Sequence, residues 1–373
     1  MYIDRTSNMP LYRQVKDILK NKIKKGELKP GDKLPSENQL VAQCGVSRPV
    51  IRQALGELAN EGWIYQEHGK GTFCLGIQSE KSNKTRNIAV IIQSITEYIC
   101  PKMIRGIQDI AHLRGYGVIL CYSDVDFTKE ALHLRNHIKN KTDGLIVDVA
   151  SDITPYPNLK YFQEMKNREI PFVMMNKYVE APDYDYVKLD DEGGLYKATK
   201  YLISLGHKRI AYVGVVCGRL AADRWKGYKK ALKEQGIDYD ERLVRFEDQG
   251  IADSPQRENW YSRVVSEFQN MGGKGPTGVT FYTDSRAIIF LKKAKEKGLR
   301  IPDDFSIVGF DDYEASKDMD PPLTTIVNPS YKIGKKAAEI LIDKIEGKET
   351  KTQKITFPAH LVERGSCKRI RNS

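Results

Sequence analysis

The first apolar residues of the chain recur at three- and four-residue steps, which is the period of one face of an α-helix. They are Leu11, Val15, Ile18, Leu19 and Ile23. This spacing predicts an amphipathic helix over residues 11–25, with Gly26 placed to end it.

Residues 28–60 carry the signals of two further helices separated by a tight turn. Ser36 is a candidate N-cap for a helix over 37–44, and Gly45 closes that segment. Ser47 is the candidate N-cap of the next helix. Its interior repeats apolar residues at helical spacing, and we expect them in the core: Val50, Ile51, Ala54, Leu55 and Leu58. This pattern predicts a helix-turn-helix.

A hairpin is predicted directly after these helices. The segments 63–65 and 72–74 flank a glycine-bearing turn at 67–71. A hairpin in this position is a wing. Residues 1–76 are therefore predicted to form a winged helix-turn-helix domain.

The pattern changes beyond this domain. Residues 77–86 are polar and lack apolar periodicity, which predicts a linker. From residue 87 on, short apolar runs alternate with helical patterns, one of them expected over 224–235. Alternating strands and helices predict parallel βαβ units in a doubly wound sheet. Because the alternation occurs in two sets, residues 87–373 are predicted to form an α/β domain of two lobes, each with a parallel sheet, and a cleft at the strand ends.

Composition narrows the class of protein. Hydrophobic residues make up 40% of the chain and no run of about 18 apolar residues occurs, so we expect no contact with a membrane. The N-terminus lacks the basic-then-apolar pattern of a secretory signal, so a cytoplasmic location is expected. The six cysteines show no metal-binding spacing, and we expect neither a disulfide nor a metal site.

The formal net charge of +11 is unevenly distributed. Residues 1–86 carry 15 Lys and Arg against 9 Asp and Glu. Positive charge concentrated in a small module favours a polyanionic partner such as double-stranded DNA.

These segments resemble known families. The turn PGDKLPSE, the turn GVSR and the wing GKGTF resemble the DNA-binding domain of the GntR family. The remainder resembles the effector domain of the LacI/GalR family, which is similar to periplasmic sugar-binding proteins. The motifs that carry this resemblance are GYG at 115–117, the run over 187–214, RWKGYKKAL at 224–232 and IPDDFSIVGFDD at 301–312.

The combination of the two domains resembles the family of bacterial arabinose-operon repressors, as do residues 95–107 and 321–347. The resemblance implies a homodimeric repressor that a small sugar, L-arabinose, releases from its operator. A dimer would hold two DNA-binding domains at the spacing of two half-sites, and effector binding would close the lobes and weaken that engagement.

Arginine suits sequence readout because its planar fork donates to O6 and N7 of guanine together. Arg48 and Arg52 lie four residues apart at the start of the second helix of the motif, and the resemblance implies that both face the operator. An alternative is that they form a solvated helix face. Secondary DNA-binding candidates are Ser36 for a phosphate, Ser47, Gln53, and the wing residues His68 and Lys70.

Sugars are usually bound by carboxylates, amides and guanidinium groups, with an aromatic ring over the apolar face. The resemblance implies that Arg224 clamps ligand hydroxyls. Asp311 and Asp284 stand at strand ends, with Asp311 the stronger expected ligand, although a carboxylate there also serves as a helix cap. Thr283 stands where the family commonly has asparagine, which removes an amide. Further candidates by position are Tyr98, Glu97, Lys177, Tyr178, Tyr282 and Trp225.

Three further residues are expected to be structural. Asp190 and Asp191 are candidate caps of the helix that begins near Glu192, and His207 is expected where that helix closes.

An enzyme is not expected. No Ser/His/Asp order, zinc spacing or phosphate-binding GxxxxGK[ST] occurs, and no cofactor is implied. Two alternatives stay open: the same architecture sensing another pentose, a hexose or a nucleoside, and a solute-binding protein with no role on DNA.

Overall fold

The computed structural model divides the chain into two compact units, Met1–Lys84 and Thr85–Ser373. It describes residues 3–370 except positions 6, 8, 30, 68–70, 76–84, 97, 141, 217, 252 and 253. No helix of the described residues is long and apolar enough to cross a membrane.

The first unit has the helix-turn-helix and hairpin that the apolar pattern predicts. Its elements are α1 (Leu11–Lys24), α2 (Glu37–Cys44), α3 (Arg48–Asn60), β1 (Ile64–Glu67) and β2 (Gly71–Cys74). The strands β1 and β2 pair antiparallel, and Lys33 forms a bridge to Phe73 that adds a third segment to the hairpin. Apolar residues from all three helices form the core, including Leu19, Leu40 and Ile51.

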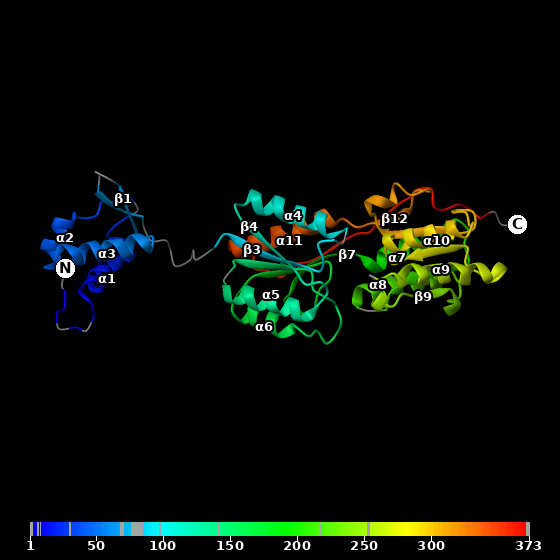
Figure 1. Ribbon diagram of the computed structural model, residues 1–373, viewed down its shortest axis with the longest axis horizontal. Helices are drawn as coiled ribbons and strands as arrows, with labels where there is room; N and C mark the ends of the chain where they lie inside the picture. Colours follow the sequence, from blue (N-terminus) through cyan, green and yellow to red (C-terminus); the bar gives the residue numbers. More distant parts are fainter. Residues whose placement is uncertain are drawn as a thin grey trace. The chain divides into compact units, whose positions relative to one another are not determined.

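The second unit contains two lobes, and the first is built on a fully parallel sheet. Its strand order is β13-β7-β6-β5-β3-β4. The strands are β3 (Asn87–Ile92), β4 (Gly117–Tyr122), β5 (Gly144–Val147), β6 (Phe172–Met175), β7 (Asp185–Leu189) and β13 (Lys354–Phe357). One face is covered by α4 (Cys100–Leu113) and α11 (Ser330–Ile345), the other by α5 (Phe127–Asn140) and α6 (Leu159–Asn167) (Figure 1).

The second lobe repeats this arrangement with the strand order β14-β12-β11-β10-β8-β9. Its strands are β8 (Ile210–Gly214), β9 (Val244–Phe246), β10 (Gly278–Phe281), β11 (Ser306–Asp311), β12 (Thr324–Val327) and β14 (His360–Val362). One face is covered by α7 (Asp191–Ser204) and α8 (Arg219–Glu234), the other by α9 (Gln256–Asn270) and α10 (Asp284–Glu296). Short 3-10 turns lie at Glu241–Leu243, Gln249–Ile251, Gly272–Lys274 and Glu314–Ser316. The prediction of a parallel sheet is wrong only for β14, which pairs antiparallel with β12.

The chain passes between the lobes three times: from β7 to α7, from β12 to α11, and from β13 to β14. Glycines allow the helices beside these connections to pack closely. A Cβ atom at Gly227 of α8 would lie 2.0 Å from the backbone oxygen of Glu192 in α7. In the first lobe, a Cβ atom at Gly106 of α4 would lie 2.2 Å from the backbone oxygen of Tyr331 in α11.

Two predicted boundaries differ from the structure. The helix expected over 224–235 begins five residues earlier, at Arg219, because Gly218 adopts φ +87° and ends the preceding segment there. Residues 85 and 86, assigned to the linker, belong to the second unit. Their backbone N–H groups donate to the carboxylate of Asp143 at 2.6 and 3.0 Å.

Candidate functional site

The first turns of α3 present two arginines to solvent. Arg48 and Arg52 are both exposed and lie one turn apart. The Nε atom of Arg48 donates to Oδ1 of Asn38 at 2.9 Å, and Nε of Arg52 lies 2.9 Å from Oε2 of Glu37. Because Asn38 and Glu37 belong to α2, the first helix of the motif orients both guanidinium groups. Gln53, the neighbour of Arg52, is also exposed.

The two candidate serine caps behave differently. Ser36 forms a capping box with Gln39: its hydroxyl accepts from the backbone N–H of Gln39, and the Gln39 side chain accepts from the backbone N–H of Ser36 at 2.8 Å. Ser47 is the N-cap residue of α3, but its side chain makes no capping hydrogen bond to the described helix, so that part of the prediction is wrong. Both serines are exposed. The wing candidates His68 and Lys70 lie outside the described residues.

The basic side chains of this unit are unequally neutralised. Lys16 lies 2.7 Å from Glu57 and 3.0 Å from Glu61, and Lys20 lies 2.9 Å from Glu61. Arg48 instead contacts a neutral amide, so no carboxylate of the described residues cancels its charge. The positive charge of Arg48 therefore remains at the exposed start of α3. Between α1 and α3, by contrast, glutamates neutralise the charges of Lys16 and Lys20.

Arg5 is a residue that the sequence reasoning missed. Its guanidinium donates to the backbone oxygen of Gly45 at 2.6 Å, in the turn before α3.

In the second lobe, Arg224 is held between two carboxylates. Its Nε donates to Asp191 at 2.8 Å and one terminal nitrogen donates to Asp311 at 3.3 Å. The other terminal nitrogen donates to the backbone oxygen of Tyr282. The guanidinium also lies over the ring of Phe310, 3.6 Å from its centroid. Arg224 is 3% exposed, so its fork is fixed before any ligand arrives.

Asp311 joins this cluster to the first lobe. Its second carboxylate oxygen accepts from the hydroxyl of Tyr98 at 2.7 Å, and the Tyr98 ring stacks on Tyr313 at 4.2 Å. The backbone of Asp311 has φ +105°, a conformation that side-chain-bearing residues rarely adopt. Asn328 contributes a further hydrogen bond of 3.2 Å to the same carboxylate. Such strain at a strand end is typical of a ligand or switch site.

Burial changes the proton affinities of this cluster. Burial raises the pKa of Asp191 to about 6, although Arg224 lowers it. Burial also raises the pKa of Tyr98 well above its usual range, and the carboxylate of Asp311 raises it further, so Tyr98 remains a hydrogen-bond donor.

A second polar cluster lies at the carboxyl ends of the first-lobe strands. Asp148 is 1% exposed and accepts from the side chain of Asn176 at 3.2 Å and from the backbone N–H of Lys177 at 3.2 Å. Gln93 donates to Asp148 at 3.3 Å and accepts from the Lys177 ammonium at 3.1 Å. Burial raises the pKa of Asp148 to about 7, while Lys177 and Asn176 lower it.

Asp284 makes its hydrogen bonds with residues outside both clusters. It is fully buried, and its carboxylate accepts from the backbone N–H of Tyr313 at 2.8 Å, the hydroxyl of Ser316 at 2.8 Å and the hydroxyl of Thr325 at 2.6 Å. These partners come from β12 and from the segment after β11. Asp284 therefore ties the strand ends together. The helix-cap role that the sequence left open for it falls to another residue, because Thr283 is the N-cap residue of α10.

Replacing Asp284 with alanine is expected to lower the free energy of unfolding by about 3 kcal/mol, because it leaves two buried hydroxyls and an N–H without their acceptor. Urea unfolding of the full chain would measure this. The matched control is Asp320→Ala, because the Asp320 side chain is 96% exposed and a change below about 0.5 kcal/mol is expected there. Loss of effector binding with unchanged stability would instead make Asp284 a ligand contact.

Of the remaining candidates, Tyr282 contacts Arg224, whereas Trp225 lies elsewhere. Guanidinium groups of Arg224 and Arg286 lie over the ring of Tyr282, at 4.7 and 5.2 Å from its centroid. Trp225 packs against Phe246 and lines a groove of about 560 Å³ with the segment 236–241, apart from the Arg224 cluster.

The candidate Tyr178 accepts from Arg219 at 3.1 Å, and its ring centroid lies 4.2 Å from that of Tyr186, with the two rings tilted by 30°. Glu97 lies outside the described residues.

Asp190 is the N-cap of α7, accepting from the backbone N–H of Gly193 at 2.9 Å, as predicted. Asp191 is the first residue of α7 and contacts Arg224 instead.

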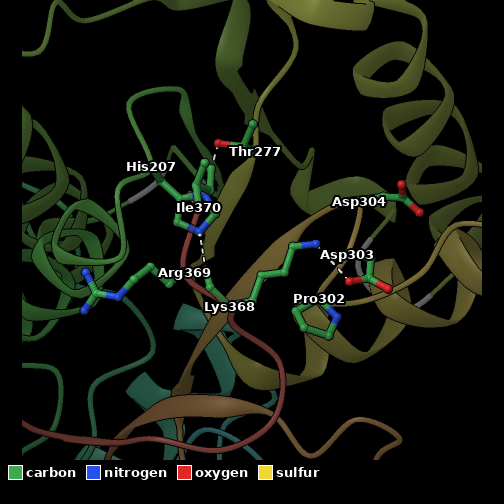
Figure 2. Close-up of a pocket in the computed structure, with 8 residues that line it drawn as sticks. All are labelled: His207, Thr277, Pro302, Asp303, Asp304, Lys368, Arg369 and Ile370. Atoms are coloured by element: carbon green, nitrogen blue, oxygen red, sulfur yellow. Dashed lines mark hydrogen bonds and ion pairs between the residues drawn. The ribbon is translucent and has the colours of Figure 1, made fainter. Parts of the chain in front are cut away.

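A different hollow of about 550 Å³ lies at the amino ends of the second-lobe strands (Figure 2). The imidazole of His207 is fixed there between the hydroxyl of Thr277 at 2.9 Å and the backbone oxygen of Lys368 at 3.1 Å. Burial lowers the pKa of His207, which favours the neutral ring. Ligands of such sheets bind at the carboxyl ends of the strands, so the Arg224 and Asp148 clusters are the stronger candidates.

Sequence reasoning missed most partners in the two clusters. They are Gln93, Asp148, Asn176, Asp191, Phe310 and Asn328. Asp148 directly follows the apolar run GLIV, so its place at the end of a strand was a usable signal. Gln93 and Asn176 carry the same signal, because they directly follow the apolar runs NIAVII and FVMM. The remaining partners carry no local pattern that marks them as members of a site.

Comparison with known proteins matches both units. Residues 11–74 match the family described as bacterial regulatory proteins, gntR family, and residues 199–367 match the periplasmic binding protein-like domain. The arabinose metabolism transcriptional repressor of Geobacillus stearothermophilus is 33% identical over 98% of this chain and 100% of its own length. The repressor of the same name from Halalkalibacterium halodurans is 34% identical over 90% of this chain and 89% of its own length.

A solved structure, the LacI family transcriptional regulator from Enterococcus faecium with bound ribose, aligns with a TM-score of 0.63. It is 26% identical and covers 76% of this chain and 100% of its own.

Proposed function

The chain belongs to the family of arabinose metabolism transcriptional repressors, which join a GntR-type DNA-binding domain to a LacI-type two-lobed domain, and from this membership we propose that it is a DNA-binding repressor released by L-arabinose. The first unit binds operator DNA through α3, and the second binds the sugar between its lobes. The chain acts as a regulator rather than an enzyme.

The polar cluster around Arg224 is the observation that carries this proposal. A buried guanidinium and the carboxylate of Asp311 are held in fixed positions, and Tyr98 reaches the same carboxylate from the other lobe. Groups of this kind hydrogen-bond neighbouring sugar hydroxyls, while Tyr98 and Tyr313 offer aromatic faces to the C–H side of a ring. A ligand that replaces the Tyr98 contact would then bias the lobe arrangement.

Binding titrations of the full chain test the sugar assignment. Isothermal titration calorimetry with L-arabinose, D-ribose, D-glucose and adenosine should give heat with L-arabinose and little with the others. Heat with adenosine alone would overturn the sugar proposal, and heat with D-ribose or D-glucose alone would overturn L-arabinose.

The operator role is tested separately. Electrophoretic mobility shifts with duplex fragments from upstream of the chain's own gene should show a complex that L-arabinose releases. A protein that binds sugar but none of these fragments would be a solute-binding protein, and the repressor proposal would be wrong.

We further propose that the chain works as a homodimer through β4. This strand lies at the edge of its sheet, and the apolar residues on and beside it are exposed: Ile119, Leu120, Tyr122, Val125 and Leu132. An edge strand offers unpaired backbone groups and pairs with a copy of itself about a two-fold axis. Two copies also suit an operator of two half-sites.

The variant Leu120→Glu is expected to weaken dimerisation at least about 100-fold, because it places a carboxylate in an apolar contact. Sedimentation equilibrium of the full chain measures the constant. Tyr239→Glu is the control, since Tyr239 is an exposed aromatic residue of the second lobe. An unchanged dimer in Leu120→Glu would remove β4 from the interface.

A further inference from the structure

The start of α8 receives its cap from the opposite lobe. Asp152 follows β5 in the first lobe and is 7% exposed. Its Oδ2 accepts from the backbone N–H of Leu220, in the first turn of α8, at 2.7 Å. The first N–H groups of a helix have no partner within the helix, and the N-cap residue Gly218 has no side chain to accept from them. Asp152 supplies that acceptor across the space between the lobes.

Gly218 allows this approach. A Cβ atom at Gly218 would lie 2.0 Å from Oδ1 of Asp152, so a side chain here would collide with the carboxylate. The backbone of Gly218 also has φ +87°, which glycine adopts without strain. The absence of a side chain thus brings the carboxylate of one lobe directly against the helix of the other.

A second contact lies beside the first but contributes less. Arg219 donates to the hydroxyl of Tyr178 at 3.1 Å and forms an ion pair with Glu180, both from the first lobe. The side chains of Arg219 and Glu180 are 27% and 58% exposed, so solvent screens the pair. The charge-assisted hydrogen bond of Asp152 is buried and therefore dominates.

We propose that Asp152 is a positioning residue that favours the closed arrangement of the lobes and so holds Arg224 ready for the effector. Arg224 lies on the same helix, four residues after Leu220, and its contacts with Asp191 and Asp311 depend on where α8 lies. When the lobes separate, the first turn of α8 and the carboxylate of Asp152 both return to water, and their contact is lost. The link between closure and effector binding rests on the proposed function, whereas the effect of Asp152 on closure does not.

Hydrogen exchange on the full chain without effector tests the closure directly. The variants are Asp152→Ala and Asp152→Asn, the second of which keeps an acceptor oxygen without the charge. The matched control is Asp126→Ala, because Asp126 also accepts from the first turn of a helix, at 2.6 Å from the N–H of Thr128, but within one lobe. Exchange is followed at α8 and in peptides that contain Tyr98 of the first lobe and Tyr313 of the second, whose rings stack on each other between the lobes.

We expect Asp152→Ala to accelerate exchange at both places several-fold, Asp152→Asn to have an intermediate effect, and Asp126→Ala to change neither. Titration with L-arabinose should then give about tenfold weaker binding for Asp152→Ala and an unchanged constant for Asp126→Ala. Acceleration confined to the first turn of α8 would make Asp152 a local cap and overturn the proposal. Because exchange is measured without sugar, a failure of the arabinose assignment would leave that result intact.

Discussion

Replacing Arg224 with alanine is expected to abolish the response to sugar and to lower the free energy of unfolding by about 3–5 kcal/mol, because a buried ion pair loses its cation. Asp191 and Asp311 would then face each other without the guanidinium that now contacts both. Effector affinity should fall at least about 30-fold, since truncating one partner of a buried, hydrogen-bonded charge pair costs more than about 2 kcal/mol in binding.

Two further variants separate binding from stability. Arg224→Lys keeps the charge but cannot reach both carboxylates and the backbone oxygen of Tyr282 together, so it should fold better than Arg224→Ala and still bind sugar poorly. Arg245→Ala is the control: its ion pair with Glu267 lies on β9 and α9, and its loss should leave effector affinity unchanged. Calorimetry and urea unfolding measure the two effects. Sugar affinity within threefold of the parent chain in Arg224→Ala would exclude this residue from the site.

Replacing Arg48 with alanine is expected to remove operator preference while leaving sugar affinity unchanged. A bidentate arginine–guanine contact discriminates against the wrong base by about 1–3 kcal/mol, so a dimer with two copies would lose roughly 30- to 25,000-fold in specific affinity. Binding to random duplex should weaken much less, because phosphate contacts supply that affinity. Fluorescence anisotropy with operator and random duplex at one salt concentration measures the ratio.

The controls for Arg48 distinguish base reading from charge. Arg48→Lys keeps the positive charge but not the planar fork, and should lose preference almost as fully as alanine. Arg13→Ala removes another exposed arginine, from α1, and should preserve the preference. If Arg48→Lys retained full preference, the residue would contact phosphate rather than a base.

The DNA-binding unit was largely predictable because its signals are local. Ser36 begins α2 with a capping box, and Gly45 ends the helix in the left-handed conformation at φ +62°. Apolar spacing alone put Ile51 and Leu55 in the core. The failure at Ser47 is also local: a residue in the N-cap position has the backbone geometry for a cap without making the side-chain bond.

The effector cleft was predictable only in part. Asp284 and Asp311 both stand near strand ends, and nothing in their neighbouring residues distinguishes their roles. Asp284 meets the hydroxyls of Ser316 and Thr325 and becomes structural, whereas Asp311 meets Arg224 and Tyr98. Tyr98 precedes Asp311 by more than 200 residues, a separation that no local pattern can bridge.

By itself, then, the sequence determined the two kinds of domain, their order and the arginine-bearing face of α3, because helix caps, turns and apolar periods are properties of neighbouring residues. Only the tertiary structure decided which carboxylates meet Arg224, which one ties strands together, and that Asp152 reaches α8 from the other lobe. Burial and pairing of charges depend on segments that the chain brings together from far apart, and those pairings set the chemistry of the cleft.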